Sequence, residues 1–73
     1  MGKWLVDLIK DAGHTHSGQT FQVTELDSWQ NCPEDKSKQL EQHFKGVVTN
    51  GVLSRYVECI GVTPEGHELY KRN

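Results

Sequence analysis

The sequence predicts a small α+β domain, with helices in its first two thirds and strands near its carboxyl end. Apolar residues recur at helical spacing within residues 3–12 and 40–48, which predicts two amphipathic helices. Residues 52–72 are rich in β-branched and aromatic side chains and contain a proline turn, which predicts a hairpin. A chain of 73 residues has the size of one domain, so we expect residues 1–73 to form a single unit.

The first predicted helix covers residues 3–12 and carries one apolar stripe. The stripe consists of Trp4, Leu5, Leu8, Ile9 and Ala12. Gly13 is suited to end this helix. Residues 13–20 contain two glycines and no large apolar side chain, so they are predicted to form a loop.

A short strand and a short second helix are expected next. Phe21 and Val23 alternate with a polar residue, which is typical of a strand. Thr24 is followed three residues later by Asp27, which approximates a capping box at the start of a helix. In that helix, Leu26 and Trp29 would face inward together.

The third predicted helix is the longest, and its periodicity is the clearest in the chain. Pro33 suits a first helical position, and Glu34 and Asp35 in the first turn complement the helix dipole. The apolar positions follow a helical spacing and are Leu40, Phe44, Val47 and Val48. The pair Asn50–Gly51 is typical of a helix end.

The carboxyl-terminal part is predicted to be a hairpin, with strands at residues 52–62 and 67–72. The turn between them has Pro64 at its second position and Gly66 at its fourth, as a type I turn prefers. The alternative makes Thr63 the cap of a terminal helix. That helix would be short and would hold Gly66 in its first turn, so the hairpin is favoured.

The order of these elements resembles the winged helix, a variant of the helix-turn-helix. A second resemblance is carried by Gly18, Phe21, Val23, Leu26, Trp29, Leu40, Phe44, Val47, Gly51, Gly61 and Tyr70. These residues, within 17–72, resemble a family of short bacterial proteins found on mobile elements and catalogued as a domain of unknown function. The family often has a basic residue where this chain has Glu41 and Gln42. The resemblance implies a winged-helix-like domain of three helices, a short strand and a C-terminal hairpin, and it implies no functional site.

The charge pattern excludes a global basic field. The formal net charge is −2; residues 1–31 carry two basic and four acidic side chains, and residues 32–73 carry six of each. Any contact with nucleic-acid phosphates must therefore come from local placement of a few cations.

The third helix offers the best candidate for such placement. Opposite its apolar stripe, helical geometry predicts a polar face that includes Lys38, Gln39, Gln42 and Lys45. Glutamine pairs with adenine, and lysine reaches phosphate or guanine. On the hairpin, a wing could contact the DNA backbone through Arg55, Lys71 and Arg72. Three carboxylates near the helix start oppose this reading, namely Glu34, Asp35 and Glu41.

These residues predict a small cytoplasmic DNA-binding regulatory protein, with the third helix as reading helix and the hairpin as wing. Its partner would be double-stranded DNA, and so few cations would call for a homodimer or a protein partner. An ordinary solvated helix face explains the same residues equally well.

A protein–protein interaction module, or a homodimeric adaptor without nucleic-acid binding, is the alternative function. A core this small need not accommodate every large side chain, and the surplus would form a contact patch. The candidates are Val6, Val52, Tyr56, Ile60 and Tyr70. The strand at residues 67–72 would add an exposed edge available for pairing.

Other functional classes find little support. Cys32 and Cys59 are expected to be reduced thiols. The dipole of the helix that follows Cys32 could lower the pKa of its thiol. A packing or capping role explains the presence of Cys32 more simply. His14 and His16 lie in a loop without the paired spacing of a zinc site, so no metal or cofactor is predicted. The sequence contains no glycine-rich loop of the kind that binds phosphates, so no such motif supports an enzymatic function. No apolar run reaches the roughly 20 residues of a membrane helix.

Overall fold

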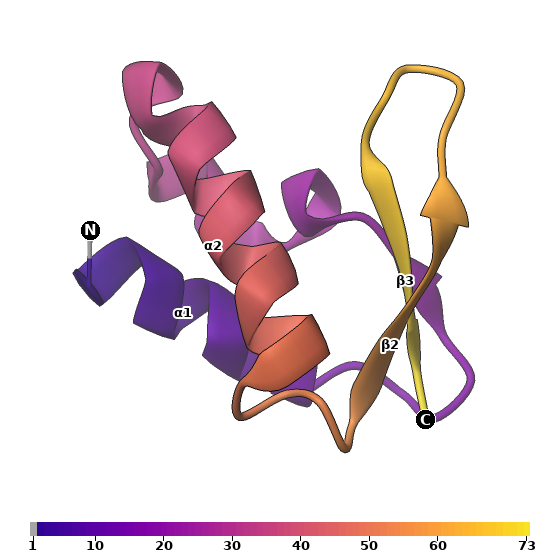
Figure 1. Ribbon diagram of the computed structural model, residues 1–73. Coiled ribbons are helices and arrows are strands. Elements are labelled where there is room, and N and C mark those ends of the chain that lie inside the picture. Colours follow the sequence, from indigo (N-terminus) through magenta and orange to yellow (C-terminus); the bar gives the residue numbers. More distant parts are fainter. Residues whose placement is uncertain (1) are drawn as a thin grey trace.

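The computed structural model describes residues 2–73 and places two α-helices on one side of a three-stranded antiparallel sheet (Figure 1). The helices are α1 (Gly2–Gly13) and α2 (Ser37–Asn50). The strands are β1 (Thr20–Phe21), β2 (Val57–Val62) and β3 (Glu68–Arg72), in the order β1-β3-β2. No helix within the described range has the length and apolar character needed to cross a bilayer.

The predicted second helix is wrong, so the domain has two α-helices rather than three. Its place is taken by the 3₁₀ turns η1 (Val23–Glu25) and η2 (Asp27–Asn31). Leu26 between them has extended backbone, with φ −70° and ψ 142°, which prevents one continuous helix. The predicted capping box is displaced as well, because Glu25 Oε1 accepts a hydrogen bond from the backbone N–H of Gln22 at 2.7 Å. Leu26 is nevertheless buried, and Trp29 packs against the core, as their spacing predicted.

The long helix begins later than its proline suggested and ends where predicted. Pro33 has extended backbone and precedes a third 3₁₀ turn, η3 (Glu34–Lys36), before α2 starts at Ser37. The N–H of Lys36 donates to the Pro33 carbonyl at 3.0 Å, the bond that closes this tighter turn. At the other end, the N–H of Gly51 donates to the Val47 carbonyl at 2.9 Å, which completes the last turn of α2.

Gly51 is required by space rather than by a left-handed backbone. A Cβ at this position would lie 2.7 Å from Val47 Cα and 2.8 Å from Val47 O, and neither backbone atom moves easily. We expect Gly51→Ala to lower the free energy of unfolding by about 1–3 kcal/mol, as overpacked sites do.

The matched control is Gly46→Ala within α2, where a Cβ would meet nothing within 4 Å. It should raise the free energy of unfolding by about 0.5–1 kcal/mol, because alanine forms helix better than glycine. Urea denaturation of both variants measures the difference. Equal midpoints for the two would contradict this description of the α2 end.

The predicted hairpin is confirmed, and the alternative of a terminal helix is wrong. The turn closes with a hydrogen bond from Gly66 N–H to the Thr63 carbonyl at 2.9 Å, and Gly66 has φ 90°. The first strand starts at Val57 rather than at residue 52, because the N–H groups of Tyr56 and Val57 bond the Leu53 carbonyl and fold this segment into turns. A bulge interrupts the β2–β3 ladder between Cys59 and Gly61.

The strand near residues 67–72 is not the exposed edge that was expected. β3 pairs with β1 through Phe21↔Tyr70 and with β2 through Cys59↔Tyr70, so it is the central strand. The edges of the sheet are β1, which is only two residues long, and β2.

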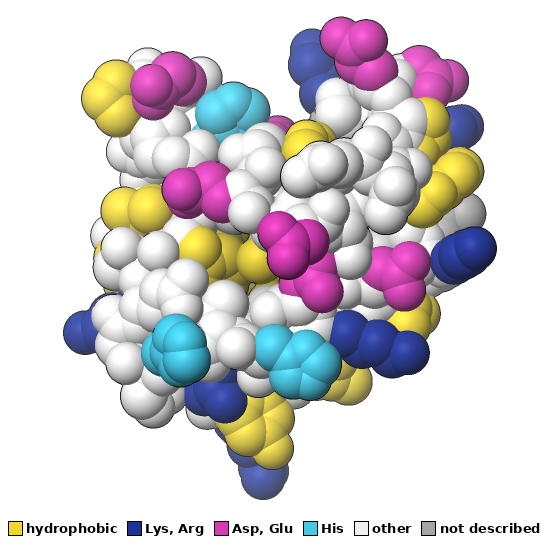
Figure 2. Space-filling view, turned by 180° about the vertical axis from the view of Figure 1, so that it is seen from behind, with side chains coloured by type: hydrophobic (Ala, Val, Ile, Leu, Met, Phe, Trp, Pro, Cys, Tyr) yellow, Lys and Arg dark blue, Asp and Glu magenta, His cyan; other side chains and the backbone are white. Residues whose placement is uncertain are grey.

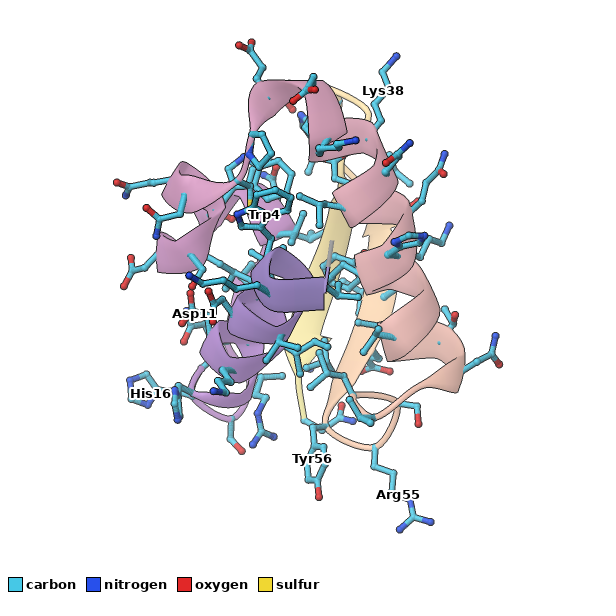
Figure 3. All side chains as sticks on the ribbon, turned by 90° about the vertical axis from the view of Figure 1, so that its left-hand side faces the viewer. Trp4, Asp11, His16, Lys38, Arg55 and Tyr56 are labelled. Carbon is cyan, nitrogen blue, oxygen red and sulfur yellow. The ribbon has the colours of Figure 1, made fainter. Side chains whose placement is uncertain are left out.

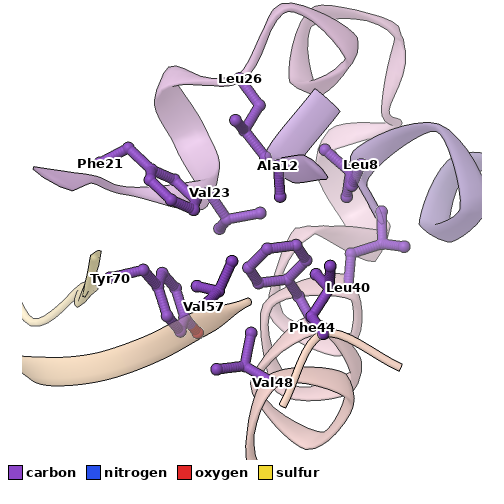
Figure 4. Packing of buried hydrophobic residues seen from close by; sticks show 11 residues of the cluster. Leu8, Ala12, Phe21, Val23, Leu26, Leu40, Phe44, Val48, Val57 and Tyr70 are labelled. Carbon is purple, nitrogen blue, oxygen red and sulfur yellow. The ribbon is translucent and has the colours of Figure 1, made fainter. Parts of the chain in front are cut away.

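The core joins α2 to both α1 and the sheet. Its buried members are Leu8, Ala12, Phe21, Val23, Leu26, Leu40, Phe44, Val48, Leu53, Val57 and Tyr70. Phe44 contacts the Tyr70 ring edge-on with centroids 5.1 Å apart, and Phe21 lies 5.8 Å from Tyr70 on the other side (Figure 4). Trp4 and Trp29 pack against this cluster, which confirms the predicted inward side of α2.

Candidate nucleic-acid interface

The outward face of α2 is exposed, as the helical pattern predicted. Lys38, Gln39 and Gln42 are all exposed, and Lys45 keeps 49% of its side-chain surface in contact with solvent. Lys38 extends away from the body of the protein near the start of α2 (Figure 3). This polarity follows from packing, because the other side of the helix is held in the core by its apolar stripe.

A groove of about 250 Å³ runs between this face and the hairpin. Its lining residues are Val23, Lys38, Glu41, Gln42, Lys45, Gly66, Glu68 and Tyr70. The structure therefore brings together Lys38, Gln42 and Lys45, as predicted for a reading helix. It also adds two carboxylates to the same groove.

Both carboxylates hold a partner across the groove. Lys45 Nζ on α2 lies 2.9 Å from Glu68 Oε1 on β3, and His67 Nδ1 lies 2.8 Å from Glu41 Oε1. Glu41 and Lys45 are one helical turn apart, so the two contacts form parallel links between α2 and the hairpin. In one link α2 supplies the carboxylate, and in the other it supplies the ammonium group.

Glu68 lines the same groove, and sequence reasoning did not single it out. Its second oxygen accepts a hydrogen bond from Cys59 Sγ at 3.0 Å. The thiol hydrogen bond, followed by the contact with Lys45, lowers the pKa of Glu68. The hydrogen bond to Glu68 raises the pKa of Lys45. Both groups are therefore charged at neutral pH, and no local pattern predicts a pair separated by 23 residues.

The basic residues expected on the wing do not join this groove. The start of α2 and the hairpin tip lie at the same end of the molecule (Figure 1), whereas Arg55 projects at the opposite end from Lys38 (Figure 3). Lys71 follows the buried Tyr70 in β3, so strand alternation directs it to the sheet face away from α2. Its pairing partner on β2 is Glu58.

Arg72 has a structural role. Its Nη1 donates to the Asn73 carbonyl at 3.0 Å and to the Tyr56 carbonyl at 3.4 Å. The guanidinium also lies over the Tyr56 ring, 5.4 Å from the centroid. The contacts with Tyr56 connect the end of β3 to the turn before β2. The guanidinium of Arg72, which was expected to contact DNA phosphates, is therefore already bound within the protein.

The opposite side of the molecule is acidic. Asp11, Glu25 and Asp27 line a second hollow together with His14 and His16. The view from behind shows acidic side chains near the centre of this side (Figure 2). These carboxylates would repel a polyanion at this hollow.

The cysteines are free but not activated. Burial, with a contribution from the Asp7 charge, raises the pKa of the Cys32 thiol, so the less favoured alternative of a pKa lowered by a helix dipole is wrong. Cys32 Sγ instead donates to the Ser28 carbonyl at 3.5 Å. Burial and the hydrogen bond to Glu68 also raise the pKa of Cys59. Neither thiol has the electropositive surroundings of a nucleophile.

Comparison with known proteins identifies no relative of this chain. No protein-family model matches it, and searches of curated proteins and of solved structures also gave no match.

Proposed function

We propose that this protein binds double-stranded DNA as a winged-helix regulator, with α2 as the reading helix and the β2–β3 hairpin as the wing. The observation that carries the proposal is the exposed set Lys38, Gln39 and Gln42 on one face of α2, beside the hairpin. A helix with such a free face fits the major groove, where glutamine pairs with adenine and lysine contacts guanine or phosphate.

The topology supports the same proposal. A helix, a short strand, the long helix and a hairpin follow one another, and the short strand pairs with the hairpin to complete a small sheet. This order resembles that of a winged helix, with 3₁₀ turns where the second helix would stand. The carboxylates of the second hollow disfavour a polyanion there, whereas the α2 groove has Lys38 and Lys45 beside its own two carboxylates.

Binding is expected to be weak and salt-dependent. Lys45 and Arg72 are engaged within the protein, and Lys71 faces away, so within residues 2–73 Lys38 is the principal cation of the α2 face without an ion-pair partner. With one or two phosphate contacts, the logarithm of the association constant should fall with the logarithm of salt with a slope of about −1 to −2. A dimer or a second protein would multiply this affinity.

Fluorescence anisotropy of a labelled duplex tests the proposal directly. At low salt we expect a dissociation constant of about 10⁻⁴ M or tighter, with the slope given above. The same oligonucleotide as a single strand should bind more weakly, because it offers no major groove to α2. No anisotropy change at protein concentrations of about 10⁻⁴ M would remove the proposal.

A protein-interaction module is the second candidate, and one observation favours it. Four large apolar side chains in and just before the edge strand β2 are exposed to solvent. They are Val52, Tyr56, Ile60 and Val62, with exposed fractions of 69%, 52%, 44% and 61%. Tyr70, which was grouped with the surplus apolar residues, is buried in the core. The bulge at Cys59–Gly61 interrupts the edge and disfavours continuous pairing with another strand. Sedimentation velocity tests whether the protein forms a homodimer. A monomer at a protein concentration of about 10⁻⁴ M would argue against a homodimeric adaptor.

A further inference from the structure

Lys45 lies on the face proposed to meet DNA, yet it already has an anionic partner. Its ammonium is 2.9 Å from Glu68 Oε1, and both side chains keep part of their surface in solvent, 49% for Lys45 and 26% for Glu68. A carboxylate oxygen and a phosphate oxygen offer the same kind of acceptor to an ammonium group. Glu68 therefore occupies the position that a phosphate would take.

The carboxylate of Glu68 is held in place from two directions. One carboxylate oxygen binds the ammonium group of Lys45, and the other accepts a hydrogen bond from Cys59 Sγ at 3.0 Å. Its backbone belongs to the central strand, two residues before the fully buried Tyr70. Because of these restraints, the negative charge remains at the groove even when Lys45 turns outward.

We propose that Glu68 is an internal competitor of the DNA phosphate, which occupies Lys45 in the free protein and must be displaced when DNA binds. This inference rests on the proposed DNA-binding function. Glu68 lowers affinity in two ways: it withholds one cation, and its remaining charge repels a phosphate placed in the groove. It thereby restricts binding to DNA that makes enough other contacts with α2 to offset the lost pair.

The neighbouring groups do not replace Glu68 in this role. Glu41, the other carboxylate of the groove, holds His67 rather than a lysine. Glu65 sits exposed in the hairpin turn, and residues 2–73 contain no ion-pair partner for it. Glu65 therefore provides a matched control, since its removal changes the net charge of the hairpin equally without releasing a cation.

The test compares duplex DNA binding by the wild type, Glu68→Gln and Glu65→Gln over a range of salt concentrations. Release of one lysine should make the salt slope of Glu68→Gln steeper by about 0.9 and raise its affinity about tenfold at low salt. Glu65→Gln should gain no more than about twofold, with the slope unchanged. The double variant Glu68→Gln, Lys45→Gln should lose the gain.

The outcomes separate this inference from the function on which it depends. If the wild type binds duplex and the two glutamine variants gain equally, or neither gains, the competitor role of Glu68 is overturned while DNA binding stands. A gain that survives the added Lys45→Gln change overturns it as well. If none of the proteins binds duplex, the proposed function fails and the role of Glu68 fails with it. Circular dichroism verifies that each variant is folded, as expected for exposed ion-pair residues.

Discussion

Phe44→Ala should lower the free energy of unfolding by about 3–5 kcal/mol, the range for truncating a large buried aromatic side chain. Phe44 has no solvent exposure, and its ring meets the edge of Tyr70 at 5.1 Å (Figure 4). It links α2 to the sheet, so its truncation opens a cavity between the helix and the strands. A domain of this length has about 4–11 kcal/mol of stability in total, so the variant would lose a large share of it and would unfold if the wild type lies at the lower end of that range.

Urea denaturation followed by far-UV circular dichroism measures this loss. Should Phe44→Ala give no folded baseline, Phe44→Leu keeps the prediction testable, because a smaller cavity should cost less and leave a measurable transition. Val52→Ala is the control: this side chain is 69% exposed, and its loss should change stability by no more than about 0.5 kcal/mol. Similar midpoints for the Phe44 and Val52 variants would contradict the described core.

Lys38→Gln should weaken duplex binding about tenfold at about 50 mM salt and make the salt slope shallower by about 0.9. Lys38 is exposed at the start of α2, lines the groove, and has no ion-pair partner in the part of the chain that the structure describes. Its charge is therefore available to a phosphate without first breaking an internal contact. Removing that charge should eliminate one counterion-releasing contact.

Lys71→Gln provides the matched control. It removes the same charge from another exposed lysine, but one that strand alternation places on the far face of the sheet. We expect its affinity to stay within about twofold of the wild type. Equal losses in the two variants would show that net charge, rather than the α2 face, governs binding. Anisotropy titrations at several salt concentrations distinguish the two results.

Elements encoded by local patterns were predictable from the sequence. The stripe from Leu40 to Val48 specifies the buried side of α2, and Pro64 with Gly66 specifies the turn of the hairpin. The second helix was not predictable in this way, because Leu26 adopts extended backbone that caps and spacing do not encode. Residues before Val57 looked like strand from their apolar content, yet Leu53 is buried in a turn rather than in the sheet.

The same distinction between local patterns and distant contacts applies to the candidate site. Helical geometry alone predicted the exposed face with Lys38, Gln39 and Gln42. The state of the remaining cations depends on contacts between distant parts of the chain, such as Lys45 with Glu68. The direction of Lys71 depends on the register of β3 with its neighbours. Such contacts arise only once the sheet has paired, so composition and spacing do not specify them.

Amide chemical shifts recorded by NMR during titration with duplex DNA test the central claim, that the side of α2 opposite the core is the surface that meets the ligand. The predicted result is a set of shifts concentrated at Lys38, Gln39 and Gln42 and at the neighbouring hairpin turn, which diminish as salt is raised. Shifts confined to the acidic rear, around Asp11 and Asp27, or no shifts at all, would contradict it.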